Sequence, residues 1–415
     1  MKRWNMSTCH QGTLRILHLL SANISVICKG KTVGKSMRLI KICAFSSILI
    51  ILIVSSTPQG RSGVKAALFI SHILTEFKNS PLTLFTKDVK HQEISFISRL
   101  GRVEADLYLP GGNSTHPGIV FFMGLVPPER DEDRIVRLGE GLARSGMVVM
   151  IPWLETQETN QLSTRDIESL VESFQYLEAH PRVERDSIGM GGICTGASMS
   201  IIAAQDVRIN DRVKFVNSFA GYYDAFDLIV STSSKTQLIE QNVVPWDPDS
   251  LTSNMISKHL LAGLDQQDKI RVASIASSNQ ASNPYNENLP KDAEAALQLI
   301  SGGTRQTATK YISDLNKETQ SFLTRISPST DIENLKAHLL LMHDTHDRLI
   351  PSGESRRLAA AVEQNGGSVY HTEFSLFQEA VKVHTDNKTH TERTYFIGEA
   401  WKLYLHMYNV MKLMQ

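Results

Sequence analysis

The chain contains a series of short apolar segments, each about one strand long and each followed by a longer stretch with helical character. A strand covered on both faces is expected to be apolar without alternation. Six segments are predicted to be parallel strands, at 118–124, 147–153, 186–192, 212–221, 338–344 and 368–377. The other stretches predict helices at 133–146, 164–180, 197–204 and 392–413. Because buried strands alternate with helices, we predict an α/β fold with a mostly parallel sheet wound on both sides.

A more polar group of elements precedes the parallel strands. Residues 93–98 and 103–109 alternate apolar and polar side chains, as paired strands with one wet face do. Gly101 lies between them and predicts a hairpin. Residues 64–77 predict a helix with its apolar positions on one side, and Gly146 predicts the end of the 133–146 helix.

A long stretch at about 225–325 separates the fourth and fifth parallel strands. Leu, Ile and Phe recur at helical spacing within it, for instance at 292–300 and 307–326, and a Ser/Asn-rich link lies at 277–287. We therefore expect a helical cap inserted near the active face. The alternative, a disordered loop, agrees less well with the apolar spacing.

Basic residues precede an apolar run near the N-terminus. Five Lys and Arg residues lie between positions 29 and 41, directly before Ile42–Val54. This run has the length of a signal-peptide core, roughly 7–15 residues, and is short for a spanning helix of about 18 or more. The cations are expected to keep their side cytoplasmic, so the body of the protein would be exported.

These observations predict the domain boundaries. We expect a basic extension at 1–36, which a start at Met37 would remove, and a signal peptide or membrane anchor at 37–58. A helical linker at 59–90 and an α/β domain at 91–415 that contains the insertion would follow. The alternative is a cytoplasmic protein in which the apolar run is a buried core helix, an arrangement that the flanking cations disfavour.

Charge and cysteine usage exclude several classes of protein. The 415 residues carry 43 basic and 43 acidic side chains, which argues against a broad nucleic-acid surface. Three of the four cysteines lie in the first 43 residues, so Cys194 has no disulfide partner within the body. No Cys-x-x-Cys zinc spacing occurs, and we predict neither a metal nor a cofactor.

Cys194 lies at the centre of a Gly-x-Cys-x-Gly sequence, in GGICTGAS at 191–198. A strand-like run ends before it and a run of small, helix-forming residues begins after it. A nucleophile elbow needs this arrangement, with glycines where a β-carbon would clash. We expect the helix N-terminus to lower the pKa of the thiol. The alternative is a small, buried, unreactive cysteine.

The same turn predicts where an oxyanion would be stabilised. The amide of Thr195 follows the nucleophile directly. A second donor should come from the loop after the 118–124 strand, around Gly124 or Leu125. Thr195 and Leu125 are therefore the predicted oxyanion residues.

The acid of such a site is expected after a later strand, because the chain order is nucleophile, acid, histidine. Asp347 is the first choice, since it begins a turn that Pro351 ends. Asp344 lies nearer the strand and is the second choice. Asp224, at the end of the previous strand, is the third.

The base is the least defined member of the site. His384 follows the last predicted strand and is chosen on position, with His390 and His371 as alternatives. A surface histidine in a polar loop would explain His384 nearly as well. The pair His343 and His346 could also indicate a metal site, but no third ligand occurs at a diagnostic spacing.

The order of these segments resembles the α/β-hydrolase superfamily. The runs GIVFFMG, MVVMIPW, DSIGMGGICTGAS and LLLMHDTHDRLIP carry the resemblance, which covers about 95–390 without the cap. The Gly-x-Cys-x-Gly elbow is similar to that of the dienelactone-hydrolase-like branch. The resemblance implies hydrolysis of a small-molecule ester or lactone through a thioester intermediate. Carried over by position, it implies a triad of Cys194, Asp347 and His384.

Two features depart from that family's pattern. His343-Asp344 stands where the family usually has His-Gly, and Glu379 stands close to the expected place of the histidine. The cap and the export segment also differ from small cytosolic dienelactone hydrolases, so the resemblance does not fix the substrate. A non-catalytic binding or scaffold protein with the same fold is therefore the alternative function. Acyl transfer or peptide cleavage by the same residues is a third possibility.

Overall fold

The structure is a computed structural model, and it describes residues 56–74, 80–125, 130–277, 289–375 and 393–414. Residues Ser62–Gln415 form one compact unit. The predicted extension at 1–36 and all but the last three residues of the predicted segment at 37–58 lie outside the described residues. In the part that is described, no helix is both long enough and apolar enough to cross a membrane.

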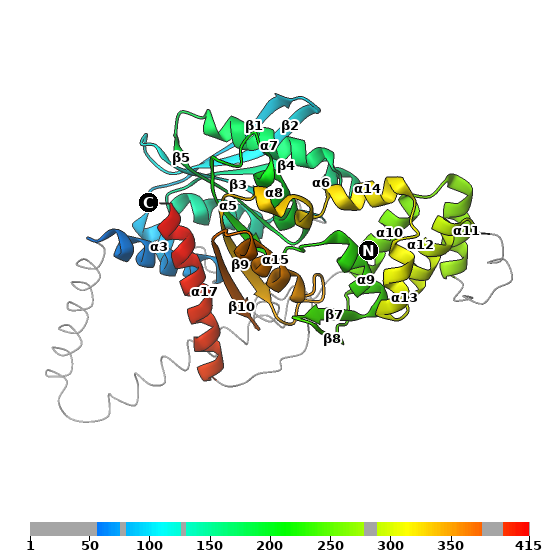
Figure 1. The fold of residues 1–415 in the computed structure, drawn as a ribbon. Coiled ribbons are helices and arrows are strands. Elements are labelled where there is room, and N and C mark those ends of the chain that lie inside the picture. Colours follow the sequence, from blue (N-terminus) through cyan, green and yellow to red (C-terminus); the bar gives the residue numbers. More distant parts are fainter. Residues whose placement is uncertain (1–55, 75–79, 126–129, 278–288, 376–392, 415) are drawn as a thin grey trace, which may run out of the picture. The chain divides into compact units, whose positions relative to one another are not determined.

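An eight-stranded sheet forms the centre of the compact unit (Figure 1). Its strands are β1 (Lys90–Ser98), β2 (Gly101–Leu109), β3 (His116–Phe122), β4 (Val148–Trp153), β5 (Val183–Ile193), β6 (Val213–Phe219), β9 (His338–Asp344) and β10 (Val369–Phe374). They lie side by side in the order β1-β2-β4-β3-β5-β6-β9-β10. The pairs β1–β2 and β2–β4 are antiparallel, and all pairs from β4 to β10 are parallel. The predicted fold class is confirmed, and this strand order is that of the α/β-hydrolase fold.

Both faces of the sheet are buried, which explains the continuous apolar runs. In β4, Val148 and Met150 belong to one apolar core, while Val149 and Ile151 belong to the other. Successive side chains of a strand point to opposite faces, so a strand between two cores has no wet position. Helices α7 (Arg165–Glu178), α8 (Thr195–Gln205) and α15 (Gly353–Gln364) contribute to the first core. Helices α3 (Pro58–Leu74), α5 (Asp133–Arg144) and α17 (Arg393–Leu413) contribute to the second.

Glycines end two of the predicted elements as expected. Gly101 pairs with Ser98 in the β1–β2 hairpin and has a φ of +137°, a conformation that favours glycine. Gly146 follows α5 with a φ of +99°, and its amide donates to the carbonyl of Ala143 over 2.9 Å. The short helices α4 (Pro81–Phe85) and α6 (Glu155–Thr159) complete this half of the chain.

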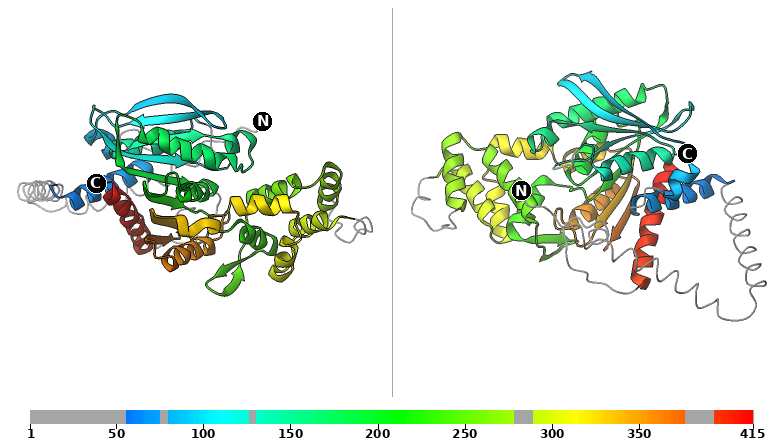
Figure 2. Two further views of the ribbon diagram at one scale, coloured as in Figure 1. Left: turned by 45° about the horizontal axis from the view of Figure 1, so that its top comes forward. Right: turned by 180° about the vertical axis from the view of Figure 1, so that it is seen from behind.

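The chain between β6 and β9 forms an insertion at 225–325, which stands beside the sheet in Figure 2. It contains α9 (Ala225–Ser234), β7 (Thr236–Ile239), β8 (Asn242–Pro245), α10 (Ser250–Ala262), α11 (Gln266–Ser277), α12 (Lys291–Ser301), α13 (Arg305–Ile312) and α14 (Lys317–Arg325). The 3-10 helix η2 (Pro328–Asn334) leads back to β9. Helices predominate, as predicted.

The insertion also contains an element that the sequence does not predict, an antiparallel hairpin of β7 and β8. Lys235 ends α9 in a left-handed conformation, and Glu240 turns the chain between the strands with a φ of +56°. The two strands have four residues each, which is too short for their periodicity to be recognised in a sequence.

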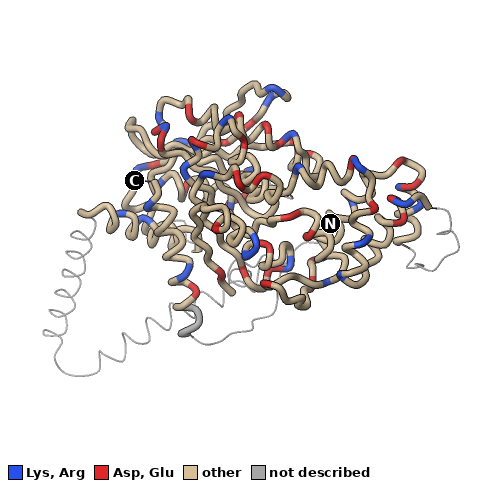
Figure 3. The backbone as a smooth tube through the Cα atoms, viewed as in Figure 1, with Lys and Arg blue, Asp and Glu red and all other residues tan. Residues whose placement is uncertain are grey.

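Lys and Arg are interspersed with Asp and Glu along the described backbone (Figure 3). Some of these charges pair closely. Arg208, for example, contacts both Glu168 and Asp206 at 2.6–2.7 Å. The basic and acidic side chains, which are equal in number in the sequence, are therefore also mixed locally along the described backbone.

Candidate active site

Cys194 occupies a sharp turn between β5 and α8. Its backbone has φ 54° and ψ −128°, an unfavourable conformation for a residue with a β-carbon. The amide of Cys194 donates to the carbonyl of Phe219 at the end of β6, and its carbonyl accepts from the amide of Ala197 in the first turn of α8. Strain of this kind costs on the order of 1–3 kcal/mol and persists only where the surrounding structure enforces it. The turn has the strand–turn–helix form predicted for a nucleophile elbow.

The two glycines of the Gly-x-Cys-x-Gly sequence are required by packing. A β-carbon on Gly192 would lie 2.5 Å from the carbonyl carbon of Gly196 and 2.6 Å from the carbonyl oxygen of Phe122. A β-carbon on Gly196 would lie 2.3 Å from that same oxygen and 2.6 Å from the amide nitrogen of Gly124. All these neighbours are backbone atoms and have little room to move. The motif therefore brings the start of α8 against the end of β3.

The thiol of Cys194 is neutral in this environment. Burial raises its pKa to about 12, the negative charge of Asp347 raises it further, and a hydrogen bond from the backbone of Thr195 lowers it. The Thr195 amide at the start of α8 lowers the pKa, as predicted for a helix N-terminus, but the net shift of the thiol pKa is upward. A helix N-terminus acts on the thiolate through one or two amides, and here the loss of hydration outweighs it.

The two predicted oxyanion residues lie together, beside Cys194. The amide of Leu125 donates to the side-chain oxygen of Thr195 over 2.9 Å. Gly124, with a φ of +79°, packs its α-carbon against α8 so tightly that a β-carbon would lie 2.5 Å from the amide nitrogen of Gly196. An oxyanion that used the Leu125 amide would have to share or replace the bond to Thr195, so the oxyanion role stays a prediction.

Asp347 lies in a turn directly after β9 and is 7% exposed. Its Oδ1 accepts hydrogen bonds from the amides of Leu349 and Ile350, at 2.6 and 3.2 Å. Burial nevertheless raises the pKa of this carboxyl group to about 7, with a smaller contribution from the charge of Asp344. Asp347 also lies close enough to Cys194 for its charge to act on the thiol. The structure thus brings together the predicted nucleophile and the predicted acid.

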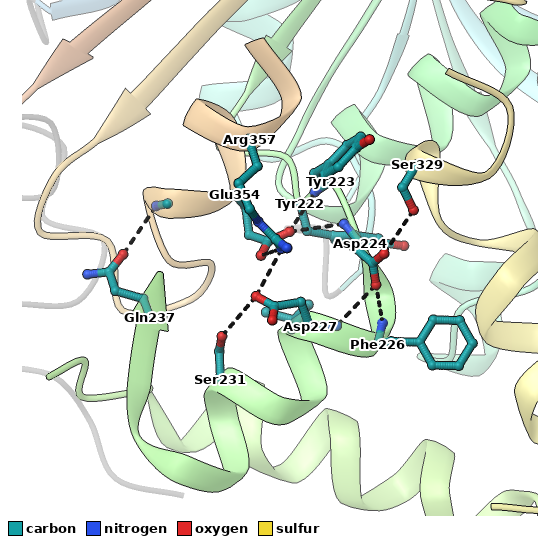
Figure 4. Close-up of polar contacts among 12 residues, drawn as sticks. Tyr222, Tyr223, Asp224, Phe226, Asp227, Ser231, Gln237, Ser329, Glu354 and Arg357 are labelled. Atoms are coloured by element: carbon teal, nitrogen blue, oxygen red, sulfur yellow. Dashed lines mark hydrogen bonds and ion pairs between the residues drawn. The ribbon is translucent and has the colours of Figure 1, made fainter. Parts of the chain in front are cut away.

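The two alternative acids have other roles. Asp224 is the N-cap of α9, where its Oδ1 accepts from the amides of Phe226 and Asp227, and its Oδ2 accepts from the hydroxyl of Ser329 (Figure 4). The Oδ1 of Asp344 accepts from the amide of His346 at 2.8 Å. Asp224 therefore serves as a helix cap.

The base is not placed, because His384 and the alternative His390 lie outside the described residues. The other alternative, His371, lies within β10 and its Nε2 is 3.1 Å from the hydroxyl oxygen of Ser355. Among the described residues, no hydrogen bond joins an imidazole to the sulfur of Cys194. The choice of His384 stays a prediction.

His343 and His346 do not lie together as metal ligands would. His343 is fully buried in β9, where its Nε2 contacts the carbonyl oxygen of Ile350 at 2.9 Å, and burial lowers its pKa to about 4. His346 is largely exposed and faces Asp344. The described residues contain no group of three potential metal ligands.

The sequence did not indicate a further network that holds the loop after β6 (Figure 4). The Oε2 of Glu354, in α15, accepts hydrogen bonds from the amides of Tyr223 and Asp224 at 2.9 and 3.0 Å. Arg357 contacts Glu354 from one turn further along the helix and also contacts Asp227 of α9. Burial raises the pKa of Glu354.

This network extends to the elbow through α8. The hydroxyl of Ser198 accepts from the amide of Tyr222 and donates to its carbonyl, at 2.8 and 2.9 Å. Ser198 lies one turn after Cys194 in the chain. The network therefore connects α15, which follows the Asp347 turn, with α8, the helix that Cys194 precedes. A glutamate in the first turn of a helix gives no sequence signal for such a role.

Comparisons with known proteins give one similarity in sequence. No model of a known protein family matches this chain. A stretch of 111 residues is 29% identical to acyl-coenzyme A thioesterase 5 of Mus musculus. The match covers 26% of this chain and spans a quarter of the length of the mouse protein.

Solved structures with the same general arrangement include a brefeldin A esterase, described as a bacterial homologue of human hormone-sensitive lipase. It has a TM-score of 0.46 and 12% identity, over 86% of this chain and 85% of that one. An esterase of Pyrobaculum calidifontis has a TM-score of 0.44 and 12% identity, over 86% and 92% of the two chains. An acylaminoacyl peptidase of Pyrococcus horikoshii has a TM-score of 0.42 and 16% identity, over 69% of this chain and 37% of that one. Values this low transfer neither an activity nor a substrate to this protein.

Proposed function

We propose that this protein is a hydrolase that cleaves a carboxylic ester or lactone with Cys194 as nucleophile, in the manner of the dienelactone-hydrolase-like branch. One observation carries the proposal: the only described cysteine is held in a strained turn between β5 and α8, beside the buried carboxyl group of Asp347. A structural cysteine needs neither the strain nor a neighbouring acid.

The raised pKa of Cys194 determines the first step. The thiol is protonated at neutral pH, so a base must remove its proton as the sulfur attacks the carbonyl carbon. We assign this base to His384, with Asp347 orienting the imidazole and stabilising its charged form. The carbonyl oxygen becomes an oxyanion, which the amides of Thr195 and Leu125 would stabilise.

The second half of the reaction restores the thiol. The tetrahedral intermediate expels the alkoxide, which takes the proton from the imidazolium and leaves as an alcohol; in a lactone, the alcohol stays joined to the acyl group. A thioester on Cys194 remains. Water, deprotonated by the same imidazole, then attacks the thioester carbonyl, and the sulfur leaves and regains the proton. No oxidant, reductant or metal takes part in these steps.

Substitution of Cys194 by alanine tests this function. The parent protein should hydrolyse p-nitrophenyl acetate, and C194A should be at least about a thousandfold slower because no other residue supplies the nucleophile. S218A is a matched control. It also removes one heavy atom at the carboxyl end of a strand, and Ser218 is buried, with no hydrogen-bond partner for its hydroxyl among the described residues.

The outcomes separate the proposal from its alternatives. Equal rates for C194A and the parent would rule out Cys194 as nucleophile. A folded parent protein without turnover on a panel of esters and lactones would favour the non-catalytic binding protein. A loss in S218A as large as that in C194A would mean that the assay reports damage to the fold.

A thioester substrate is the second candidate, and the similarity to a thioesterase over 111 residues favours it. Attack of Cys194 on a thioester exchanges one thiol for another, so the leaving group needs less assistance than an alkoxide does. Release of free thiol from acetyl-coenzyme A, compared with release of p-nitrophenol under the same conditions, distinguishes the two substrates. A kcat/KM at least tenfold higher for the thioester would replace the ester proposal.

A further inference from the structure

The turn that carries Asp347 is bound by the insertion through three consecutive carbonyl groups. The carbonyl of Asp347 accepts from the indole nitrogen of Trp246 over 2.7 Å. The carbonyl of Arg348 accepts from the amide of Asp249, also over 2.7 Å. The carbonyl of Leu349 accepts from the hydroxyl of Thr252 over 2.8 Å. All three donors lie within seven residues of the insertion, at 246–252, which we call the contact segment.

The two side-chain donors of the contact segment are well placed to fix the turn. Trp246 is 7% exposed and Thr252 is 9% exposed, so their hydrogen bonds are shielded from water and are costly to leave unmade. The nearby ion pair of Arg348 with Asp247 is much more exposed, with the Asp247 side chain 75% accessible. An exposed pair of this kind contributes little. The buried hydrogen bonds therefore dominate the contact.

The other side of the turn is held by the sheet domain. The side chain of Asp347 itself accepts from the amides of Leu349 and Ile350. The carbonyl of Ile350 contacts the ring of the buried His343. The carbonyls of residues 347–349 therefore accept hydrogen bonds from the insertion, whereas the carbonyl of Ile350 contacts His343 of β9 in the sheet domain. Without the contact segment, the carbonyls of three successive residues would lose these partners.

We propose that the contact segment positions the acid of the active site, so that Trp246 and Thr252 are positioning residues for Asp347. The insertion is then part of the catalytic apparatus. This inference rests on the function proposed above, because it gives Asp347 the role of the acid. It extends that function by making the geometry of the acid depend on a segment about 100 residues away in the chain.

Kinetics of conservative variants test the inference. W246F removes the indole N–H and keeps an aromatic ring, and T252V removes the hydroxyl at nearly constant volume. Each should lower kcat about three- to tenfold, the effect of one buried hydrogen bond, and leave KM nearly unchanged, because a displaced acid affects the reaction rather than substrate binding. T252S retains the hydroxyl and should restore the parent kcat.

W153F is the matched control. The indole nitrogen of Trp153, in β4, donates to the carboxylate of Asp106, in β2, over 2.6 Å, and β3 separates β4 from β5, which precedes Cys194. This variant should lose stability in the same way as W246F while keeping the parent kcat. The inference is overturned if W246F and T252V act on KM alone, if T252S is as impaired as T252V, or if W153F lowers kcat equally.

A second measurement does not need turnover. The charge of Asp347 raises the pKa of Cys194, so D347N should make alkylation of Cys194 by iodoacetamide faster at pH 9. W246F should also accelerate it, since displacement of Asp347 weakens the same repulsion. W246F should add nothing further in a D347N background. An effect of W246F that persists undiminished in D347N would show general loosening of the fold and would overturn the inference. Because alkylation is independent of esters, this result stands even if the proposed hydrolase activity fails.

Discussion

At the residue scale, Cys194 has a strained backbone, and the pKa values of Cys194 and Asp347 are both raised above their ordinary values. Cys194 combines a backbone φ of 54° with a thiol whose pKa is raised to about 12. Asp347 is a carboxyl group whose pKa is raised to about 7. Perturbed groups of opposite function that share one site are typical of catalysis and atypical of a structural core.

The sequence singled out Cys194 and Asp347 as candidate site residues, but it did not predict their raised pKa values. The glycines around Cys194 and the turn before Pro351 are local features, so they can be recognised from a few neighbouring residues. The pKa of the thiol depends on how much protein surrounds it, which is set by segments far away in the chain. The lowering by the first amide of α8 is therefore predictable from the sequence, but the larger opposing effect of burial is not.

The raised pKa of Asp347 predicts how stability depends on pH. Its pKa in the folded state lies above the ordinary value of 3.8, so this group stabilises the fold most at low pH and loses that contribution as the pH rises through about 7. D347N removes the titration. Above pH 7 it should be more stable than the parent by about 1 kcal/mol or more, since one pKa unit corresponds to about 1.4 kcal/mol.

Urea denaturation of both proteins between pH 5 and pH 8 measures this difference. D88N is the control, because it removes one carboxyl group from a fully exposed position. A D347N protein that parallels the parent across this range would show that Asp347 does not titrate near neutrality.

At the element scale, the sequence predicted the sheet domain well and the insertion less well. Strands such as β4 are buried on both faces, so their apolar runs stand out from the surrounding sequence. The β7–β8 hairpin has four-residue strands of mixed polarity, and no periodicity signal exists at that length. Whether an element can be predicted from the sequence therefore depends on its length and on how completely it is buried.

The packing of the elbow gives a prediction for this scale. G196A places a β-carbon 2.3 Å from the carbonyl oxygen of Phe122 and 2.6 Å from the amide nitrogen of Gly124. Both are backbone atoms, so β3 and α8 must separate, and the free energy of unfolding should fall by about 1–3 kcal/mol or more.

Thermal denaturation checks this against G398A. Gly398 lies in α17, and a β-carbon there has no atom within 4 Å. This variant should be neutral or more stable by up to about 1 kcal/mol, because alanine is the better helix former. Equal stability of G196A and G398A would contradict the close packing of the elbow.

At the scale of the whole molecule, polar contacts join the insertion to the sheet domain close to the site. Glu354 and Arg357 of α15 contact the loop after β6 and Asp227 of the insertion. Trp246 and Thr252 contact the Asp347 turn. These contacts join residues about 100 or more positions apart, so no local pattern in the sequence could predict them. The assignment of His384 as the base rests on the sequence alone, because this residue lies outside the described residues.

The most direct measurement for Cys194 as nucleophile is to trap its acyl intermediate. The parent protein is mixed with p-nitrophenyl acetate, quenched in acid before one turnover is complete, digested and analysed by mass spectrometry. We predict one acetyl group on the peptide that contains Cys194, present in the parent and in S218A and absent in C194A, together with the loss of turnover in C194A. An acetyl group found only on other residues, or turnover by C194A at the parent rate, would contradict the assignment of Cys194 as the nucleophile.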